Sequence, residues 1–287
     1  MPELKKRNTM YLLFDIGATN TRLAVSKDLQ SFQEPRIIPT DQSFDVAVKN
    51  MVATALELSK GEHILAAAGG IAGPLDKEKS KLVVAPNIPD WENKPLQKEL
   101  EGAFNGPVFL ENDTAIIGLG ELADGAGKGS EIFSYITIST GLGGCRFVDG
   151  RIDRSAFGFE PGHHIIDADR TYMNGSNPEG HIEGFVSGAG FKKRFGKNPE
   201  EINDEQVWEE ATHALGIALH NIILLWSPDT MVIGGSLTKK LEIEAIVKEV
   251  ENTMVIFKEL PEIKKAELGD IGGLHGAMAY LRQRIEL

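Results

Sequence analysis

DIGATNTR, at Asp15–Arg22, and STGLGG, at Ser139–Gly144, are the two segments from which the architecture of this chain can be inferred. Each segment follows an apolar run typical of a β-strand and leads into another such run. Glycine has no Cβ, so a bend of Gly, Thr and Asn lets backbone N–H groups approach a phosphate closely. The two segments therefore predict two phosphate-holding hairpins, and together they favour two half-sites that face each other across one nucleotide.

The composition is that of an acidic globular protein. The chain has 287 residues, of which 41% are hydrophobic and 25% charged, with a net charge of −12, and it is long enough for two medium domains or one large domain. A nucleic-acid partner is not expected, because binding to a phosphate backbone needs clustered Lys and Arg. The N-terminus lacks the apolar core of a signal peptide, and no apolar run approaches the roughly 20 residues that span a bilayer. We therefore expect a cytoplasmic protein without a membrane partner.

Cys145 is the only cysteine, so the sequence excludes an internal disulfide and indicates a reducing compartment. It lies in the strand-like run after the second loop, where the role of a small buried apolar residue is expected. A catalytic thiol is the alternative, but no local feature would lower the pKa of this thiol.

Apolar patterning in the first part of the chain predicts a mixed sheet with helical cover. The predicted strands are Tyr11–Phe14, Arg22–Ser26, Arg36–Ile38, Ile64–Ala68 and Pro107–Leu110, and the predicted helices are Phe44–Leu58 and Leu96–Phe104. The strand–turn–strand order restarts after residue 133, with strands at Tyr135–Ile138 and Cys145–Val148 around the second loop. This internal repeat of pattern predicts a second domain.

The remaining segments are less uniform. Residues 155–184 show little periodicity and are rich in His, Asp, Gly and Asn, which is typical of a functional loop. Further predicted elements are the helix Thr114–Leu122, which would cross between the domains, the helix Val207–Trp226, the strand Thr230–Ile233, a strand within Met254–Leu268 and the helix Gly272–Leu281.

Two carboxylates stand near the ends of predicted strands. Asp15 begins the first loop, where it can hold the water shell of a Mg²⁺ ion beside phosphates or simply start a turn. Asp113 follows the strand Pro107–Leu110 and opens a helix, where it can cap the helix or act as general base for a hydroxyl that attacks phosphorus. The sequence leaves both roles of Asp113 open. Asn112 beside it can donate to and accept from sugar hydroxyls.

Glu160, His163 and Glu183 form a third candidate set, in the segments GFEPGH and HIE. Carboxylates accept hydrogen bonds and imidazole donates or accepts them, a combination that suits the vicinal hydroxyls of a sugar. The alternatives are a polar surface loop and a metal site, the latter made by His163, His164 and His181 with Asp167 or Asp169. The ligand types permit a metal, although the spacing matches no standard metal motif.

On these segments and several others, the chain resembles the ROK family of bacterial sugar kinases and sugar-responsive repressors over nearly its whole length. The matching segments are DIGATNTR at 15–22, GGIAGPLD at 69–76, PNIPDW at 86–91, ENDTAIIGLGE at 111–121, STGLGGCRFVDGRI at 139–152, EPGH at 160–163, HIEGFVSGAG at 181–190, MVIGGSLTK at 231–239 and ELGDIGGLHGAM at 267–278. Each motif is weak alone, and their number and order carry the resemblance.

The resemblance implies an α/β fold of the two-domain actin/hexokinase-like (ribonuclease H-like) ATPase type, with an interdomain cleft. Residues 1–113 would form a small N-terminal domain, rejoined by the C-terminal helix 274–287, and residues 114–273 a large C-terminal domain. Relatives of this kind are usually dimers, so a homodimer is expected.

The resemblance also implies roles for individual residues. Asp113 would be the base that deprotonates the sugar hydroxyl, and Asp15 would organise Mg²⁺. The implied sugar-binding residues are Gly70, Asn87, Asn112, Asp113, Glu160, His163 and Glu183. The residues implied for the ATP phosphates are Gly17, Thr19, Asn20, Thr140, Gly141 and Gly143, with Gly234, Gly235 and Ser236 beside the adenosine.

One departure from the family pattern concerns a structural zinc ion. Many members bind zinc through a His and a Cys-x-Cys-Gly-x-x-Gly-Cys run, whose cysteines are replaced here by Asn174, Ser176 and His181. Without those thiolates the usual tetrahedral site cannot form, so we expect no structural zinc. The sugar-binding residues around the run are retained, so loss of activity is not expected.

The leading expectation is therefore an ATP-dependent hexose kinase that uses ATP and Mg²⁺ and acts, by family habit, on the 6-hydroxyl of a glucose-like sugar. One alternative is an N-acylhexosamine kinase such as one for N-acetylmannosamine or N-acetylglucosamine, which differs in the room left at the sugar's 2-position. The other is a non-catalytic sugar-sensing regulator. Only fourteen residues precede Asp15, too few for the helix-turn-helix of the family's repressors, and this favours the kinase.

Overall fold

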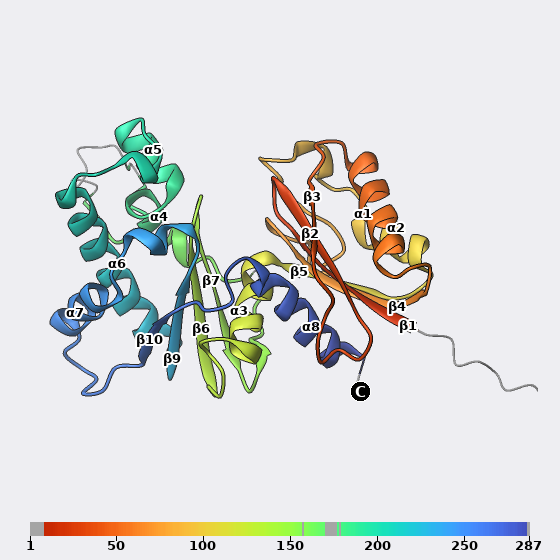
Figure 1. The fold of residues 1–287 in the computed structure, drawn as a ribbon. Coiled ribbons are helices and arrows are strands. Elements are labelled where there is room, and N and C mark those ends of the chain that lie inside the picture. The colour runs from red at the N-terminus through yellow and green to blue at the C-terminus, as the bar shows by residue number, and fades with distance from the viewer. Residues whose placement is uncertain (1–8, 157, 170–176, 178, 286–287) are drawn as a thin grey trace, which may run out of the picture. The chain divides into compact units, whose positions relative to one another are not determined.

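The computed structural model describes residues 9–156, 158–169, 177 and 179–285 (Figure 1). The chain divides into two compact units, the first formed by Met1–Ala123 with Asp270–Leu287 and the second by Asp124–Gly269. Each unit contains its own five-stranded sheet and its own helices.

The first unit is built on a mixed sheet with the strand order β3-β2-β1-β4-β5. β1 (Thr9–Ile16) and β2 (Asn20–Ser26) form the antiparallel hairpin predicted around the first loop, and β3 (Arg36–Pro39) pairs antiparallel with β2. β4 (His63–Ile71) is parallel to β1, and β5 (Val108–Asn112) is parallel to β4. The carboxyl ends of these three parallel strands meet at one edge of the sheet, which is where open α/β sheets bind ligands.

Helices cover this sheet, with α1 and α2 on one face and α8 on the other (Figure 1). α1 (Phe44–Leu58) and α2 (Leu96–Phe104) have the predicted bounds, which confirms these two predictions. They share an apolar core with the 3₁₀ helix η1 (Pro89–Trp91). α3 (Asp113–Asp124) follows β5 directly, and α8 (Gly272–Arg284) packs on β1 and β4.

Glycines let α3 and α8 cross with their backbones in contact. A Cβ on Gly276 would lie 1.7 Å from the carbonyl oxygen of Ile116, and a Cβ on Gly120 would lie 2.3 Å from that of Gly272. No side chain fits between the helices at these positions. The last helix of the chain therefore packs directly on a helix that begins beside Asn112.

The second unit repeats the hairpin in a sheet with the order β10-β9-β6-β7-β8. β6 (Ile132–Ile138) and β7 (Leu142–Val148) are the antiparallel strands predicted around the second loop, and β8 (Arg151–Ile152) extends them. β9 (Thr230–Gly234) is parallel to β6, and β10 (Glu262–Lys265) is parallel to β9.

The helices of the second unit follow the irregular segment of the sequence. They are α4 (Ile182–Phe185), α5 (Gly188–Phe195), α6 (Glu205–Trp226) and α7 (Ile243–Thr253), with the 3₁₀ turns η2 (Pro161–His163), η3 (Pro199–Glu201) and η4 (Ser236–Lys240), and η5 (Gly269–Ile271) precedes α8. α6 supplies much of the core through Leu215, Leu219 and Ile222. Of the helices in the described ranges, none has both the length and the apolar character needed to cross a bilayer.

Neither α5 nor α7 was predicted from the sequence. The sequence of α5, GAGFKKRF, contains two glycines, which lower its helix propensity, and its ends stabilise it instead. The Ser187 side chain accepts a hydrogen bond from the Gly190 N–H at 2.9 Å, and Gly196 ends the helix in the left-handed conformation. α7 has apolar residues at helical spacing, Ile243, Ile246, Val247 and Val250, so its pattern does indicate a helix, and this prediction was missed.

Candidate functional site

The first loop is a tight hairpin whose tip is bonded by Thr40. Within the loop, the Gly17 N–H donates to the Asn20 carbonyl at 3.0 Å. Thr40, which is 8% exposed, donates its N–H to the Thr19 carbonyl at 2.9 Å and its hydroxyl to the Gly17 carbonyl at 2.7 Å. The Thr40 and Thr21 hydroxyls bond each other at 2.8 Å. Thr40 therefore fixes the loop through uncharged groups.

The acidic candidates of the first unit gather at the carboxyl edge of its sheet. Asp15 on β1 lies opposite Gly70 on β4, which in turn lies opposite Glu111 on β5. Asn112 ends β5, and Asp113 begins α3. A Cβ on Gly70 would lie 3.0 Å from the Cα of Asp113, so a glycine lets β4 and the start of α3 approach closely. The structure thus brings together Asp15, Gly70, Asn112 and Asp113.

Asp15 is a buried carboxylate, 8% exposed, with little room around it. A Cβ on Gly273 would lie 2.7 Å from its Cγ, and the Arg22 guanidinium lies 3.8 Å from its Oδ2. Burial raises the pKa of Asp15 to about 6, Arg22 opposes the rise, and the Asp270 carboxylate adds to it. Asp15 therefore gains its charge only as the pH approaches neutrality.

Asp113 is partly buried, and its pKa is raised to about 7. Burial is the largest cause and the neighbouring Asp15 carboxylate the second, while the hydrogen bond from the Thr114 N–H, 2.8 Å from Oδ1, opposes them. The third amide of the turn, that of Ala115, donates instead to Asn112 Oδ1 at 3.3 Å. Capping of α3 is thus shared between two side chains, and Asp113 has a pKa suited to proton transfer near neutral pH.

Sequence reasoning missed Glu111, which stabilises the junction between β5 and α3. Glu111 is 5% exposed, forms an ion pair with Lys79 and accepts the Asn112 N–H at Oε1 at 3.0 Å. The Tyr280 hydroxyl of α8 lies 3.4 Å from its Oε2, and burial with the Glu111 charge raises the pKa of Tyr280 to about 12. The carboxylate directly before the Asn-Asp pair is the only sequence signal for this role.

The two amides predicted to hold a sugar are placed differently. The Asn112 side chain donates to the Gly73 carbonyl at 3.2 Å, so it is oriented within the group described above. Asn87 is exposed, in a separate turn before η1. The structure therefore groups Asn112 with Asp113 and leaves Asn87 at the surface of the first unit.

In the second unit, the second loop is attached to the start of α5. Within the loop, the Ser139 N–H donates to the Gly141 carbonyl at 2.9 Å. From outside, the Gly188 N–H donates to the Ser139 carbonyl at 2.7 Å and the Ala189 N–H to the Thr140 carbonyl at 2.9 Å. The first turn of α5 therefore positions both residues at the tip of the hairpin.

The predicted sugar-binding residues of the second unit lie beside this loop. Glu183, in the first turn of α4, accepts the Leu142 N–H at Oε2 at 2.8 Å. Burial raises the pKa of Glu160, His163 opposes the rise, and the Glu183 charge adds to it, so these three side chains interact electrostatically. His163 Nδ1 lies 3.3 Å from His181 Nδ1. Glu160, His163 and Glu183 thus form one cluster.

The metal alternative gains no support from this cluster. Within the described ranges, no group of three or more His, Cys, Asp or Glu side chains is arranged to hold a metal ion. Asn174 and Ser176, two of the three residues that replace the zinc-binding cysteines, lie outside the described residues. The absence of zinc therefore stays a prediction that rests on the missing thiolates.

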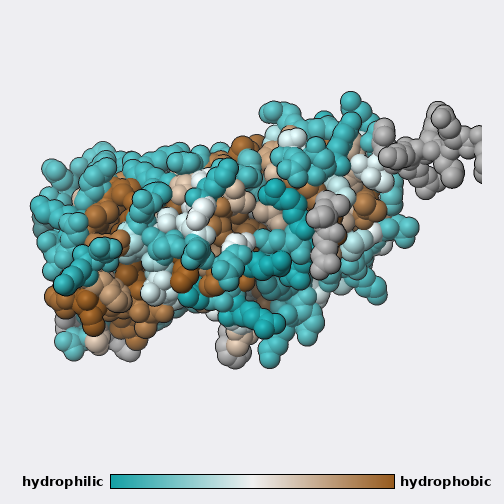
Figure 2. Space-filling model, turned by 90° about the horizontal axis from the view of Figure 1, so that it is seen from below, coloured by the Kyte–Doolittle hydropathy of each residue, from teal (hydrophilic) through white to brown (hydrophobic). Residues whose placement is uncertain are grey.

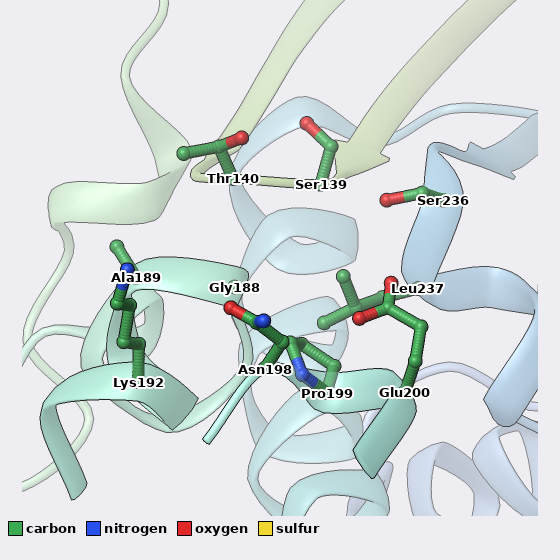
Figure 3. A pocket seen from close by; sticks show the side chains of 10 residues that line it. All are labelled: Ser139, Thr140, Gly188, Ala189, Lys192, Asn198, Pro199, Glu200, Ser236 and Leu237. Carbon is green, nitrogen blue, oxygen red and sulfur yellow. The ribbon is translucent and has the colours of Figure 1, made fainter. Parts of the chain in front are cut away.

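A pocket of about 360 Å³ opens beside the second loop (Figure 3). Its lining residues are Ser139, Thr140, Gly188, Ala189, Lys192, Asn198, Pro199, Glu200, Ser236 and Leu237. Thr140 and Ser236, predicted for the phosphates and the adenosine of ATP, line the same pocket. Figure 3 shows Lys192 and Glu200 on opposite sides of it.

Two of the glycines predicted for the nucleotide, Gly141 and Gly235, are the sequence neighbours of Thr140 and Ser236, which line this pocket. Gly235 has φ +92°, and a Cβ there would lie 2.3 Å from the Ile138 carbonyl oxygen, so only glycine fits between β9 and β6. Gly234 ends β9, Gly141 lies in the loop, and Gly143 pairs with Thr137 across the hairpin. Sequence reasoning missed the pocket residues of α5 and η3, because no motif marks Lys192, Asn198 or Glu200.

Two mixed sheets, each carrying a glycine-containing hairpin and packed with helices, define an α/β protein of the actin-like ATPase fold. The sequence pattern described as "ROK family" matches residues 11–284, and the chain belongs to this family.

Individual relatives match over nearly the whole chain. A glucokinase of Thermotoga maritima is 27% identical over 99% of both chains. An N-acetyl-D-glucosamine kinase of Salmonella typhimurium is 27% identical over 93% of this chain and 98% of the relative. The crystal structure of a ROK family glucokinase from Streptomyces griseus, in complex with glucose and AMPPNP, is 25% identical and superposes with a TM-score of 0.76 over 96% of this chain and 99% of that one.

Proposed function

We propose that this protein is an ATP-dependent hexose kinase, which transfers the γ-phosphate of ATP to a sugar hydroxyl. The observation that carries the proposal is Asp113, a partly buried carboxylate with a pKa of about 7 at the sheet edge where the first loop begins. A general base works best when its pKa lies near the working pH. The glucokinase and N-acetyl-D-glucosamine kinase relatives, and the glucose and AMPPNP held by the Streptomyces griseus enzyme, support the same activity.

In the first unit, Asp113 accepts the proton of the attacking hydroxyl as its oxygen bonds to phosphorus. Asn112, Gly70 and Asn87 contribute to binding of the sugar. Gly17, Thr19 and Asn20 hold phosphate oxygens of ATP at the first loop. Asp15 fits a Mg²⁺ ion, because Mg²⁺ prefers carboxylate oxygens as ligands. The pKa of Asp15 is about 6, and a bound cation would favour the ionised carboxylate. Mg²⁺ would neutralise charge on the phosphates.

In the second unit, Glu160, His163 and Glu183 hold sugar hydroxyls as one cluster. Thr140, Gly141 and Gly143 hold phosphates at the second loop, and Gly234, Gly235 and Ser236 lie beside the adenosine. The pocket that Thr140 and Ser236 share supports this division of the nucleotide between loop and pocket.

The acceptor we propose is the 6-hydroxyl of a glucose-like hexose. A second candidate is an N-acylhexosamine, which the Salmonella typhimurium relative favours. A sugar-sensing regulator without catalysis is the third, and the glucokinase and N-acetyl-D-glucosamine kinase relatives favour the kinase over it.

The test is ADP release from ATP and Mg²⁺ across a panel of hexoses and N-acetylhexosamines, with ATP alone as the control. Turnover with one sugar, and little with ATP alone, is the expected result. Turnover confined to N-acetylhexosamines would select the second candidate. Binding of a sugar in calorimetry without any turnover would contradict the kinase proposal and favour the sugar-sensing regulator.

We also propose a homodimer. Val255, Ile256 and Phe257, in the turn after α7, are 93, 70 and 42% exposed, and Figure 2 shows hydrophobic side chains gathered on the surface of the second unit. Apolar patches of this kind commonly mark protein interfaces. Light scattering after size exclusion should give a dimer for the wild type and a monomer for Ile256→Glu; a monomeric wild type would contradict this proposal.

A further inference from the structure

The geometry points to Glu183 as a positioning residue for the second loop, through which the sugar-binding cluster is tied to the nucleotide-binding loop. This inference rests on the proposed function and goes beyond it, since the proposed function gives Glu183 contact with the sugar alone.

A hydrogen bond joins the Glu183 side chain to the second loop. Glu183 Oε2 accepts the N–H of Leu142, the residue at which the second loop enters β7, at 2.8 Å. A hydrogen bond from a backbone N–H to a carboxylate is charge-assisted and roughly twice as strong as a neutral one. The other outside bonds to this loop, from Gly188 and Ala189, are made by backbone groups. Glu183 is therefore a side chain on which the position of the loop depends.

The two oxygens of the Glu183 carboxylate have different hydrogen-bonding partners available to them. Oε2 is engaged by the loop, while Oε1 accepts no hydrogen bond within the described part of the chain. Glu160, whose pKa Glu183 helps to raise, and His163 belong to the proposed sugar cluster. One carboxylate can thus bond a sugar hydroxyl through Oε1 and the loop through Oε2.

Little space remains between the Glu183 carboxylate and the second loop. A Cβ on Gly141 would lie 2.6 Å from Glu183 Oε2, so the carboxylate fills the place that a side chain at position 141 would take. The φ of Gly141 lies outside the left-handed region, so the backbone allows alanine there. Gly141→Ala would therefore displace the carboxylate and leave Glu183 in the chain.

The test measures binding of AMPPNP with Mg²⁺ by calorimetry, without sugar, in variants checked for a native melting curve. Glu183→Ala should weaken AMPPNP binding about tenfold, and Glu183→Gln, which keeps an acceptor, should weaken it less. Removing a negative charge would by itself favour an anionic nucleotide, so a loss of affinity isolates the hydrogen bond. Glu160→Gln, the matched control in the same cluster, should lower sugar affinity and leave AMPPNP affinity within about twofold.

A double-mutant cycle with Gly141→Ala completes the test. Gly141→Ala should weaken AMPPNP binding in the wild type and have little further effect in Glu183→Ala, because the displaced group is then absent. Unchanged AMPPNP affinity in Glu183→Ala, an equal loss in Glu160→Gln, or full additivity in the cycle would each overturn the inference and leave the proposed function standing. Failure of the wild type to bind AMPPNP would overturn both.

Discussion

The two loops have the same hairpin construction and are held in different ways. Thr40 fixes the first loop through its N–H and hydroxyl, and no charge is involved. The second loop is held by Glu183, a carboxylate that we also propose as a sugar ligand. Hairpins of similar pattern can therefore be held by uncharged groups in one unit and in part by a charged side chain in the other. Sequence similarity between such loops says little about this difference.

The acidic residues of the two units also differ in how strongly their pKa values are raised. Burial raises the pKa of Asp15 to about 6 and that of Asp113 to about 7, and the Asp15 carboxylate adds to the rise at Asp113. Glu160 is also raised, but His163 beside it offsets part of the effect. The first unit therefore changes its charge near neutral pH, and this is where we place proton transfer.

The largest expected effect is the loss of that proton acceptor. Asp113→Asn should lower kcat by about 10²–10⁴-fold, because the amide cannot accept the hydroxyl proton. Sugar affinity, measured by calorimetry, should change little. Glu160→Gln is the comparison variant in the second unit and should act mainly on sugar affinity. A kcat for Asp113→Asn within tenfold of the wild type would contradict the proposal that Asp113 is the general base.

The next effect concerns the hold on the first loop. Thr40→Val keeps the shape of the side chain and removes the hydroxyl, which leaves the Gly17 carbonyl without its partner. Unfolding free energy should fall by about 1 kcal/mol in denaturant titrations, because a partly buried acceptor loses its donor. Thr40→Ser, which keeps the hydroxyl, should lose less. Equal losses for Val and Ser would show that packing, not the hydrogen bonds, matters here.

A smaller effect should appear in the pH dependence of kcat/KM. Asp113 must be ionised to act as base, so activity should fall as the pH drops through about 7. Asp15→Asn removes the carboxylate that raises the pKa of Asp113, so the acidic limb should move to lower pH. At pH 6 the variant should retain a several-fold larger share of its own plateau activity. An acidic limb at the same pH in Asp15→Asn would show that the Asp15 charge does not raise the pKa of the catalytic base.

The smallest expected effect tests the pocket of the second unit. Lys192→Ala should weaken AMPPNP binding by about two- to threefold, because an exposed ammonium adds little to phosphate binding in water. Lys193→Ala is the control, since Lys193 is an exposed neighbour that does not line the pocket. Equal effects of the two variants would mean that general charge, and not the pocket, attracts the nucleotide.

Local patterns were enough to predict the hairpins and several helices. Apolar residues at helical spacing predicted α1 and α2 with their observed bounds, and the glycine segments predicted the strand pairs β1–β2 and β6–β7. These elements depend on residues close together in the sequence, so their signal is contained in short windows.

The missed features depend on contacts between distant segments. Thr40 and the first loop, Glu183 and Leu142, and Glu111 with Tyr280 are joined only when the chain folds. α5 is short and glycine-rich, so its stability comes from its cap and its packing, and propensity gave no reason to expect it. The roles of the site residues stay predictions that rest on family resemblance and on the geometry around Asp113 and Glu183.

The most direct test of the kinase itself is ³¹P NMR of a single reaction with ATP, Mg²⁺ and the sugar selected from the panel. We predict one phosphomonoester for each ADP formed, with a phosphorus resonance coupled to the two protons of the sugar's CH₂ group, as expected for transfer to the 6-hydroxyl. Inorganic phosphate as the only product, or ATP left unconsumed, would contradict the account.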